Sequence, residues 1–317
     1  MNLQRPMENR LRFAALCSVA VVGCLVALVS CRKGQGESVE IDSGLATLVP
    51  PDTVYLLGVN VERLSRTPAW QRLDNLTLPD LNRFVQATGV DPRKDIREIL
   101  ACSNGTGAVT VIRGSFRTSD LATRLQAAAA KTTSYRGHTI YGADRAALTF
   151  LDSSIAVAGS EASVEGIVDA HDHGGGGLTQ PLKSLLETVP ARDQLWMVRS
   201  GGLPGMRFGE NDESRLGSII QMLRGIRTIV MGADFSNGLN FVARVDCQSD
   251  DDATHVHDAL RGAIGMARLN TPDSHPELLR VYDAIQVSQE KTLVTASADF
   301  SAQQVTEALD VWLKRTH

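Results

Sequence analysis

The chain has 317 residues, of which 32 are basic and 36 acidic, so its formal net charge at pH 7 is −4. A surface of this sign does not attract nucleic acid, and an aromatic content of 5% argues against a surface that stacks bases or sugars. The hydrophobic content of 43% is that of a globular protein.

The N-terminal 30 residues have the layout of an export signal. Basic residues come first, an apolar segment follows over residues 13–30, and the run Leu28-Val29-Ser30-Cys31 closes it. This order indicates a signal peptide that is removed from the mature protein. The closing run resembles the lipobox of bacterial lipoproteins. The resemblance implies cleavage between Ser30 and Cys31 and lipidation of Cys31, which would anchor the protein to a membrane of the cell envelope.

Two alternatives concern the same segment. The 18 residues from 13 to 30 are close to the minimum of about 17 for a membrane-spanning helix, so an uncleaved signal anchor is the first. The second is cleavage before Cys24, but this would leave an apolar stub at residues 25–29, so Cys31 is the better site. Because the basic residues precede the apolar run, the N-terminus is expected in the cytoplasm and the body of the protein outside it.

Cleavage makes the remaining protein more acidic. Residues 1–30 contain three arginines and one glutamate, so 29 basic and 35 acidic residues remain and the formal charge is −6. No later apolar run is long enough to span a membrane. The lipidated N-terminus is therefore the expected membrane contact, and nucleic acid is not an expected partner.

A polar tether and a first folded unit are predicted next. Residues 31–48 are rich in glycine, serine and charge, which favours a flexible tether. The first unit is expected over residues 49–173. Its predicted elements are strands at 54–61 and 108–113, helices at 68–88 and 92–102, a helix from Thr118, a meander of strands over 139–158 and a helix capped by Ser160.

The second unit follows a glycine-rich linker and a connecting helix at residues 174–189, and is expected over residues 190–317. The run Ser236-Asn237-Gly238 between two apolar arms is the strongest hairpin signal in the chain. The other predicted elements are a strand at 194–199, a helix capped by Ser214, a helix at 251–269, a hairpin with arms at 284–288 and 292–298, and a helix capped by Ser301 and Gln304.

Both halves thus run strand, helices, strand, helix, hairpin, helix. Hairpins next to helices favour antiparallel sheets with helices on one face. We therefore predict an α+β fold of two similar units, each a mainly antiparallel sheet with helices packed on one face. A single larger mixed α/β sheet is the alternative.

Several turn and strand-start residues carry a second resemblance. The runs Pro51-Asp52-Thr53 and Gly159-Ser160-Glu161, and then Pro190 before an apolar strand, resemble a family of exported bacterial proteins of unknown function. The resemblance covers residues 50–313, although residues 201–213 depart from it. It implies export and the repeated α+β plan, and it brings no activity, cofactor or catalytic residue.

Two cysteines are left for the folded part. Of the five in the chain, Cys17 and Cys24 fall within the signal, and Cys31 would carry the lipid. In an oxidising envelope Cys102 and Cys247 could form a disulfide. The alternative is two separate thiols buried as small apolar residues.

A candidate metal site is the run His171-Asp172-His173, because imidazole and carboxylate groups are metal ligands. A zinc site needs three or four converging ligands, and no others stand nearby in the sequence. The alternative is a polar helix end, where histidine is favourable. The pair His255 and His257 and the acidic run at residues 250–252 are better explained as features of a helix surface and a helix start.

No catalytic motif is present. The chain lacks a Gly-x-Ser-x-Gly elbow, a His-Glu-x-x-His motif and a complete phosphate-binding glycine loop, so no cofactor is expected. The leading hypothesis is a lipid-anchored cell-envelope protein, a non-catalytic binding or scaffolding module with an envelope protein as partner. The alternatives are an envelope hydrolase with a dispersed active site and a carrier of a small apolar ligand.

Overall fold

The computed structural model describes residues 37–74, 85–86, 89–116, 118–128, 131–143, 146–201, 224–271 and 276–316. The described residues from 38 onward belong to one compact unit by their internal contacts. The predicted signal peptide, Ser30 and Cys31, and the helix expected after Ser214 lie outside the described residues.

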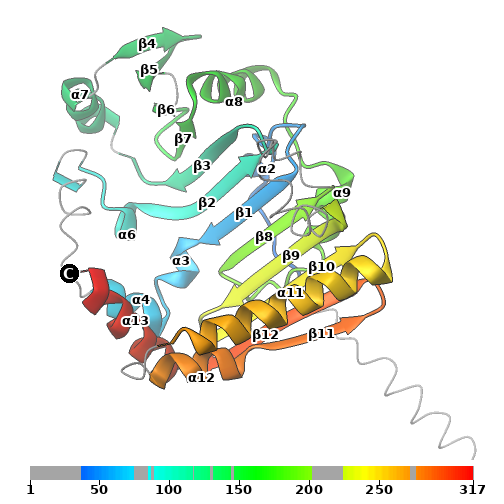
Figure 1. Cartoon of the computed structure of the whole chain (residues 1–317). Coiled ribbons are helices and arrows are strands. Elements are labelled where there is room, and N and C mark those ends of the chain that lie inside the picture. Colours follow the sequence, from blue (N-terminus) through cyan, green and yellow to red (C-terminus); the bar gives the residue numbers. More distant parts are fainter. Residues whose placement is uncertain are drawn as a thin grey trace, which may run out of the picture. The chain divides into compact units, whose positions relative to one another are not determined.

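The described residues form one twelve-stranded sheet in which every neighbouring pair is antiparallel (Figure 1). The strand order is β11-β12-β10-β9-β8-β1-β2-β3-β7-β6-β5-β4. The strands are β1 (Tyr55–Asn60), β2 (Ile96–Ser103), β3 (Ala108–Gly114), β4 (Thr132–Tyr135), β5 (His138–Ala143), β6 (Ala146–Phe150), β7 (Ile155–Gly159), β8 (Leu195–Ser200), β9 (Ile226–Asp234), β10 (Gly238–Cys247), β11 (Gln286–Glu290) and β12 (Leu293–Ser301).

The two halves of the chain have the same strand order within this sheet. The first half contributes β1-β2-β3-β7-β6-β5-β4, and its first five strands match the order β8-β9-β10-β12-β11 of the second half. The first strands of the two halves, β1 and β8, pair with each other and join the halves into one sheet. Without this pairing, β1 and β8 would each be an exposed edge strand of a smaller sheet. The predicted α+β class with antiparallel strands is confirmed, and the halves share a single sheet.

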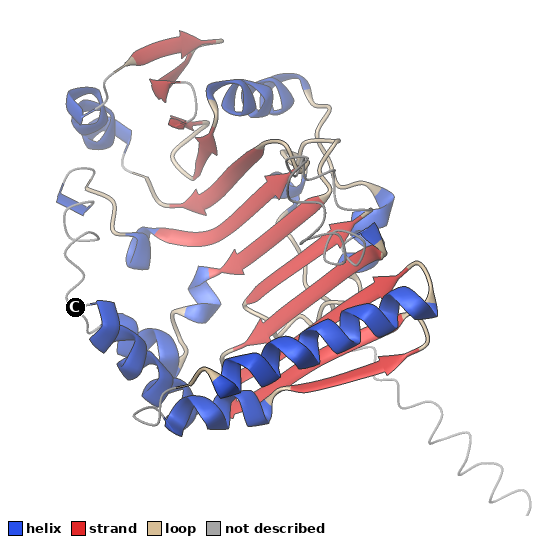
Figure 2. Cartoon of the chain, viewed as in Figure 1, coloured by secondary structure: helices blue, strands red, loops and turns tan. Residues whose placement is uncertain are grey.

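Ten helices lie within the described residues (Figure 2). They are α2 (Ser43–Ala46), α3 (Val61–Leu64), α4 (Pro68–Asp74), α6 (Pro92–Asp95), α7 (Thr118–Ala128), α8 (Glu161–His173), α9 (Gln180–Leu186), α11 (Asp250–Leu269), α12 (Pro276–Ala284) and α13 (Ala302–Thr316).

Local capping signals confirm several predicted helix starts. The Ser160 hydroxyl accepts a hydrogen bond from the Ser163 N–H at 3.2 Å and begins α8. At the start of α13, the Gln304 side chain accepts from the Ser301 N–H at 2.9 Å, and the Ser301 hydroxyl accepts from the Gln304 N–H at 3.3 Å. This reciprocal pair is the predicted capping box.

The helix predicted at residues 92–102 is wrong. Only Pro92–Asp95 is helical, and the chain continues as strand β2. This strand lies between β1 and β3 and is paired on both edges, with Leu100 opposite Gly58 and Val111. Pairing on both edges outweighs the helical preference of a short segment.

Helices cover both faces of the sheet, whereas the sequence predicted helices on one face. Leu56, Cys102 and Val198 lie opposite one another on one face. Their core cluster includes residues of α2, α8 and α9. In each strand, the residues next to these three point to the opposite face of the sheet. There Val256 of α11 packs in a second cluster with Cys247, and Leu121 of α7 packs in a third.

The folded unit begins earlier than the predicted tether allows. The Val39 N–H donates to the Val189 carbonyl at 2.9 Å, and Leu45 and Leu48 are buried in the main core. Asp42 caps α2 by accepting hydrogen bonds from Gly44 and Leu45. The apolar residues spaced along 39–49 therefore pack onto the sheet, and this part of the predicted tether belongs to the folded unit.

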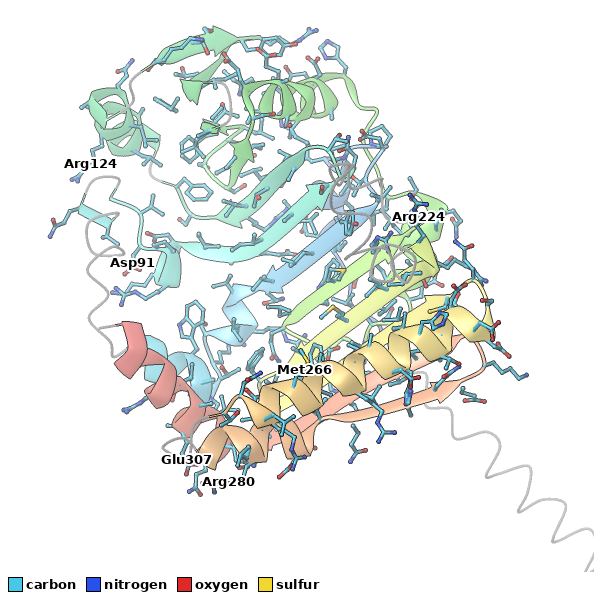
Figure 3. The ribbon with its side chains drawn as sticks, in the orientation of Figure 1. Asp91, Arg124, Arg224, Met266, Arg280 and Glu307 are labelled. Carbon is cyan, nitrogen blue, oxygen red and sulfur yellow. The ribbon has the colours of Figure 1, made fainter. Side chains whose placement is uncertain are left out.

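No helix within the described part of the chain is long and apolar enough to cross a membrane. Met266 projects from α11, as Figure 3 shows. Its surface is 64% exposed. Leu269 is also exposed, near the end of the same helix. Single exposed apolar side chains of this kind are ordinary on protein surfaces.

Candidate functional site

A cleft of about 560 Å³ lies between the segment Pro50–Thr53, the turn from β2 to β3, and helix α8. Apolar groups dominate its wall, including Pro51, Val109, Ile167 and Ala170. A cleft of this size can hold a small molecule or a peptide side chain, since ligand sites commonly measure about 300–1,000 Å³.

The turn between β2 and β3 is held by Asn104. Its side-chain oxygen accepts hydrogen bonds from the N–H groups of Thr106 and Gly107, at 3.0 and 2.9 Å. Its side-chain amide donates to Asp52 at 2.7 Å, which ties the turn to the segment before β1. Asn104 therefore gives this side of the cleft a defined shape.

Helix α8 forms the opposite wall. Val164, Ile167 and Val168 are buried, which fixes the orientation of the helix on the sheet. Gly166 lines the cleft, and a Cβ placed there would meet nothing within 4 Å. The cleft is consequently open at this point, and a larger side chain would extend into it.

Arg136 and Asp169 form an ion pair in the cleft wall. The Arg136 Nε lies 2.5 Å from Asp169 Oδ1, and the Tyr135 hydroxyl donates to the same carboxylate at 3.1 and 3.2 Å. Arg136 and Gly137 have φ angles of 46° and 83°, as a tight two-residue hairpin turn between β4 and β5 requires. The turn thus places a cation beside a mostly apolar cleft.

The hydroxyl and thiol groups of the cleft are not activated. Burial raises the pKa of the Cys102 thiol to about 12, so this group stays protonated at neutral pH. The Ser163 hydroxyl shares a hydrogen bond with the Ser160 hydroxyl at 2.7 Å. The Thr53 hydroxyl is buried and has no hydrogen-bond partner among the described residues. None of these groups is hydrogen-bonded to a histidine or a carboxylate in the described structure.

Cys102 and Cys247 are free and buried, so the disulfide considered from the sequence is not formed. They lie in different core clusters, on β2 and β10. Strands β1, β8 and β9 stand between these two. Four strand spacings of about 4.8 Å separate the cysteines by far more than the reach of about 7 Å between bridged Cα atoms.

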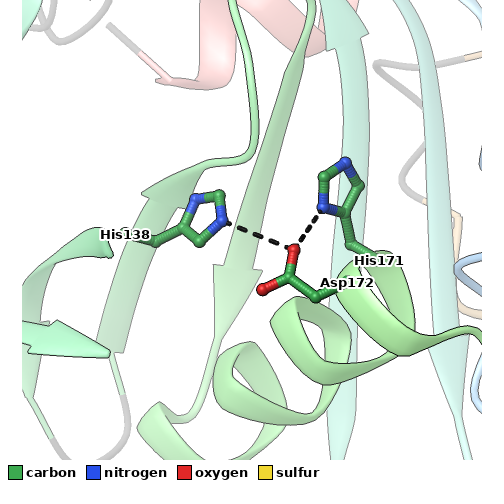
Figure 4. A group of neighbouring side chains, drawn as sticks. All are labelled: His138, His171 and Asp172. Carbon is green, nitrogen blue, oxygen red and sulfur yellow. Dashed lines mark hydrogen bonds and ion pairs between the residues drawn. The ribbon is translucent and has the colours of Figure 1, made fainter. Parts of the chain in front are cut away.

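His171 and Asp172 come together with His138, which the sequence did not single out (Figure 4). The His171 Nδ1 lies 2.9 Å from Asp172 Oδ1, and the His138 Nε2 lies 3.8 Å from the same oxygen. His173 does not join this group and instead lines the cleft. His138 stands on β5, and only the packing of α8 on the sheet brings it near. No sequence spacing could have indicated this partner.

The electrostatics of this group favour an ionised carboxylate. A hydrogen bond with His171 is the main cause that lowers the pKa of Asp172, and the charges of His138, His171 and His173 add to it against a smaller effect of burial. Nearby, burial tends to raise the pKa of Asp152. Hydrogen bonds from Ser154 and Ile155 and the charge of His171 together outweigh burial and lower this pKa.

The acidic run at residues 250–252 and the pair His255 and His257 lie on helix α11, as expected. The Ser249 hydroxyl accepts from the Asp252 N–H at 3.1 Å and begins α11. His257 contacts its neighbour Asp258, with 2.9 Å between Nδ1 and Oδ1. Within the described ranges, the group of His138, His171 and Asp172 is the one set of at least three such side chains whose ligand atoms converge.

Comparisons with known proteins add little to this description. No protein family model matches the chain, and no curated protein does. Among solved structures, three crystal forms of TP0453 are similar, with TM-scores of 0.44, 0.45 and 0.45 and sequence identities of 11%, 11% and 8%. The matches cover 86%, 85% and 83% of this chain and 97%, 98% and 95% of the TP0453 chains. TM-scores below 0.5 do not establish a common fold.

Proposed function

We propose that this chain is a lipid-anchored protein of the bacterial cell envelope whose cleft binds a partner or ligand without chemical reaction. The run ending in Cys31 supports the anchor, because it has the features of a lipoprotein signal. The cleft beside α8 supports the binding role.

The observation that carries the proposal is the composition of the cleft wall. Apolar groups make up most of it, and its carboxylates are engaged in structural contacts: Asp52 with Asn104, and Asp169 with Arg136 and Tyr135. Cys102 is protonated because burial raises its pKa to about 12. A wall of this kind buries an apolar ligand and offers few groups for acid–base catalysis.

The best-fitting occupant is an apolar peptide segment or small molecule. Pro51, Val109 and Ile167 provide apolar contact area, and backbone groups of the turn from β2 to β3 provide directional contacts. The Arg136 cation lies in the wall and would favour an occupant with a polar or anionic end.

Filling the cleft tests the binding role. Gly166 lines the cleft, and a Cβ there meets no atom within 4 Å, so Gly166→Phe would add an aromatic ring to the cleft wall. Gly262→Phe is the matched control, since Gly262 lies on helix α11 away from the cleft and is equally open. Each full-length variant is used to capture partners from detergent-solubilised envelopes.

A partner that is recovered with the wild type and Gly262→Phe but lost with Gly166→Phe would support the proposal. Equal recovery with all three proteins would show that the cleft is not the binding surface. Hydrolytic turnover in a substrate screen, abolished by Gly166→Phe alone, would favour the envelope hydrolase instead. Copurification of a small apolar molecule, lost in the same variant, would favour a carrier.

The anchor is tested separately. Replacing Cys31 with serine should prevent lipidation, so the protein would leave the membrane fraction and lose the mass of the acyl chains. Fractionation and intact-mass spectrometry measure both. An unchanged mass together with unchanged membrane association would contradict the lipid anchor and favour an uncleaved signal anchor.

A further inference from the structure

We infer that His138, His171 and Asp172 form a binding site for a divalent transition-metal ion such as Zn²⁺. This inference does not rest on the cleft, because none of the three residues lines it. Two imidazoles and one carboxylate are a common ligand set for zinc, and imidazole also suits copper and nickel.

The geometry brings three ligand atoms to one point. Each residue offers an atom that lies within 4.8 Å of the other two. The contacts to Asp172 Oδ1 measure 2.9 Å from His171 and 3.8 Å from His138. Ligands around a tetrahedral zinc ion with bonds of about 2.0–2.1 Å lie about 3.4 Å apart. Small side-chain rotations are therefore enough to close the site around an ion.

The His138 ring is already held in the orientation that a metal ligand needs. Its Nδ1 lies 3.3 Å from the Phe150 carbonyl oxygen. A carbonyl can only accept, so in the neutral ring, the form that binds a metal, this contact favours the proton on Nδ1 and leaves Nε2 as the ligand atom. Nε2 is the atom that faces Asp172. Histidine ligands of metals commonly bond a backbone carbonyl through their other nitrogen in this way.

The exposure of the three side chains leaves room for an ion to enter. His138 is 18% exposed, Asp172 27% and His171 37%. Three protein ligands at the surface leave at least one coordination position for water or for a group of another molecule. The negative charge of the Asp172 carboxylate attracts a cation.

Binding would link two elements that are far apart in the sequence. His138 stands on β5, and His171 and Asp172 stand in the last turn of α8. An ion shared by them would fasten the end of the helix to the β4–β5 hairpin. The site would therefore stabilise this end of the sheet as well as hold a metal.

A matched control exists within the chain. His257 and Asp258 repeat the local contact of His171 and Asp172, with the same distance of 2.9 Å between Nδ1 and Oδ1. No third ligand joins them among the residues that the structure describes. A sequence-adjacent pair alone should bind far more weakly than a converging set of three.

The test measures Zn²⁺ binding to the full-length chain in detergent micelles, by competition with a chromophoric zinc chelator. The variants are His138→Ala, His171→Ala and Asp172→Asn, with His257→Ala as the control. We expect one saturable site, at least about 100-fold weaker in each of the first three variants and unchanged in His257→Ala. His171 is the most exposed of the three ligands, so His171→Ala keeps the test valid if His138→Ala does not fold.

Cobalt provides an independent readout of the same ligands. Co²⁺ bound to two imidazoles and a carboxylate should give visible absorption bands that are lost in His171→Ala and kept in His257→Ala. No saturable zinc binding to the wild type would overturn the inference. Equal affinity in the wild type and in both His171→Ala and Asp172→Asn would overturn it too, as would an equal loss in His257→Ala.

Discussion

The indole ring of Trp196 on β8 lies against Gly58 on β1, the residue directly opposite it in the antiparallel pair. A Cβ at residue 58 would overlap the indole atoms Cζ2, Cε2 and Nε1. Trp196 is 2% exposed and belongs to the main core. The pair therefore lets a large aromatic ring lie across the joint between the two halves of the sheet.

Gly58→Ala should destabilise the protein strongly. The added methyl group cannot fit without moving a buried tryptophan at the centre of the sheet, and overpacking of this kind costs about 1–3 kcal/mol. Urea unfolding of the full chain measures the change in the free energy of unfolding. Gly262→Ala is the control, because its methyl group would meet no atom. A loss below about 0.5 kcal/mol for Gly58→Ala would contradict the packing described here.

Gly166→Ala should have the opposite effect. Gly166 lies inside α8, where alanine is favoured over glycine by about 0.5–1 kcal/mol, and its new methyl group would project into open space. The free energy of unfolding is expected to rise by that amount. Gly142→Ala provides the contrast, because Gly142 has a φ of 93° and its Cβ would meet the Ala146 carbonyl. If Gly166→Ala were destabilising, α8 would not be helical or open at this position.

Ionisation of the Cys102 thiol should lower the free energy of unfolding at high pH. Its pKa is raised by burial from 9.0 to about 12, so the native state holds the thiol proton more tightly than the unfolded state. Between these values the native state binds more protons, and the free energy of unfolding falls by at most about 1.4 kcal/mol per pH unit as pH rises. Below pH 9 both states are protonated and the effect is absent.

The measurement compares unfolding of the wild type and Cys102→Ala between pH 8 and pH 11. Other groups titrate in this range, so the difference between the two proteins isolates the thiol. The wild type should lose stability more steeply than Cys102→Ala. Identical slopes would show that the Cys102 thiol ionises with an ordinary pKa. Rapid reaction of this thiol with iodoacetamide in the native protein would show the same.

Arg199→Met should stabilise the protein. The Arg199 side chain is fully buried, and its three guanidinium nitrogens have no hydrogen-bond partner among the described residues. Its guanidinium carbon lies 5.2 Å from the centroid of the Tyr55 ring. This cation–π contact offsets only part of the cost of burying a charge.

Methionine is a flexible apolar side chain that can fill much of the same space without a charge. The free energy of unfolding is expected to rise by about 1–4 kcal/mol, as in other replacements of buried charges by apolar residues. Thermal and urea unfolding measure it, with Tyr55→Leu as a companion that removes only the ring. A loss of stability in Arg199→Met would mean that an anionic group holds this arginine in the native protein.

Much of the fold follows from local signals in the chain. The run Ser236-Asn237-Gly238 forms the turn between β9 and β10, and Gly238 has a φ of 128°. The helix predicted at residues 251–269 is α11, and Ser160 and Ser301 cap helices as predicted. These features depend on residues within a few positions of one another, so the sequence shows them directly.

Features that depend on distant partners were predicted poorly. Residues 96–103 look helical in isolation but form a strand because β1 and β3 pair with both of their edges. The partner of His171 and Asp172 is His138, which approaches only because α8 packs on the face of the sheet that carries Leu56. The packing of helices on both faces likewise depends on distant partners, and the sequence predicted helices on one face only.

The sequence by itself determined the α+β class, the turn at residues 236–238 and the starts of several helices, because capping, turn chemistry and hydrophobic periodicity act over short distances, and it predicts the signal that ends at Cys31. Tertiary structure alone decided that β1 and β8 join the halves into one sheet, that Cys102 and Cys247 remain apart, and that three metal-ligand side chains meet beside α8. These outcomes depend on which strand edges pair and which apolar faces pack together, and residues close in sequence do not determine either.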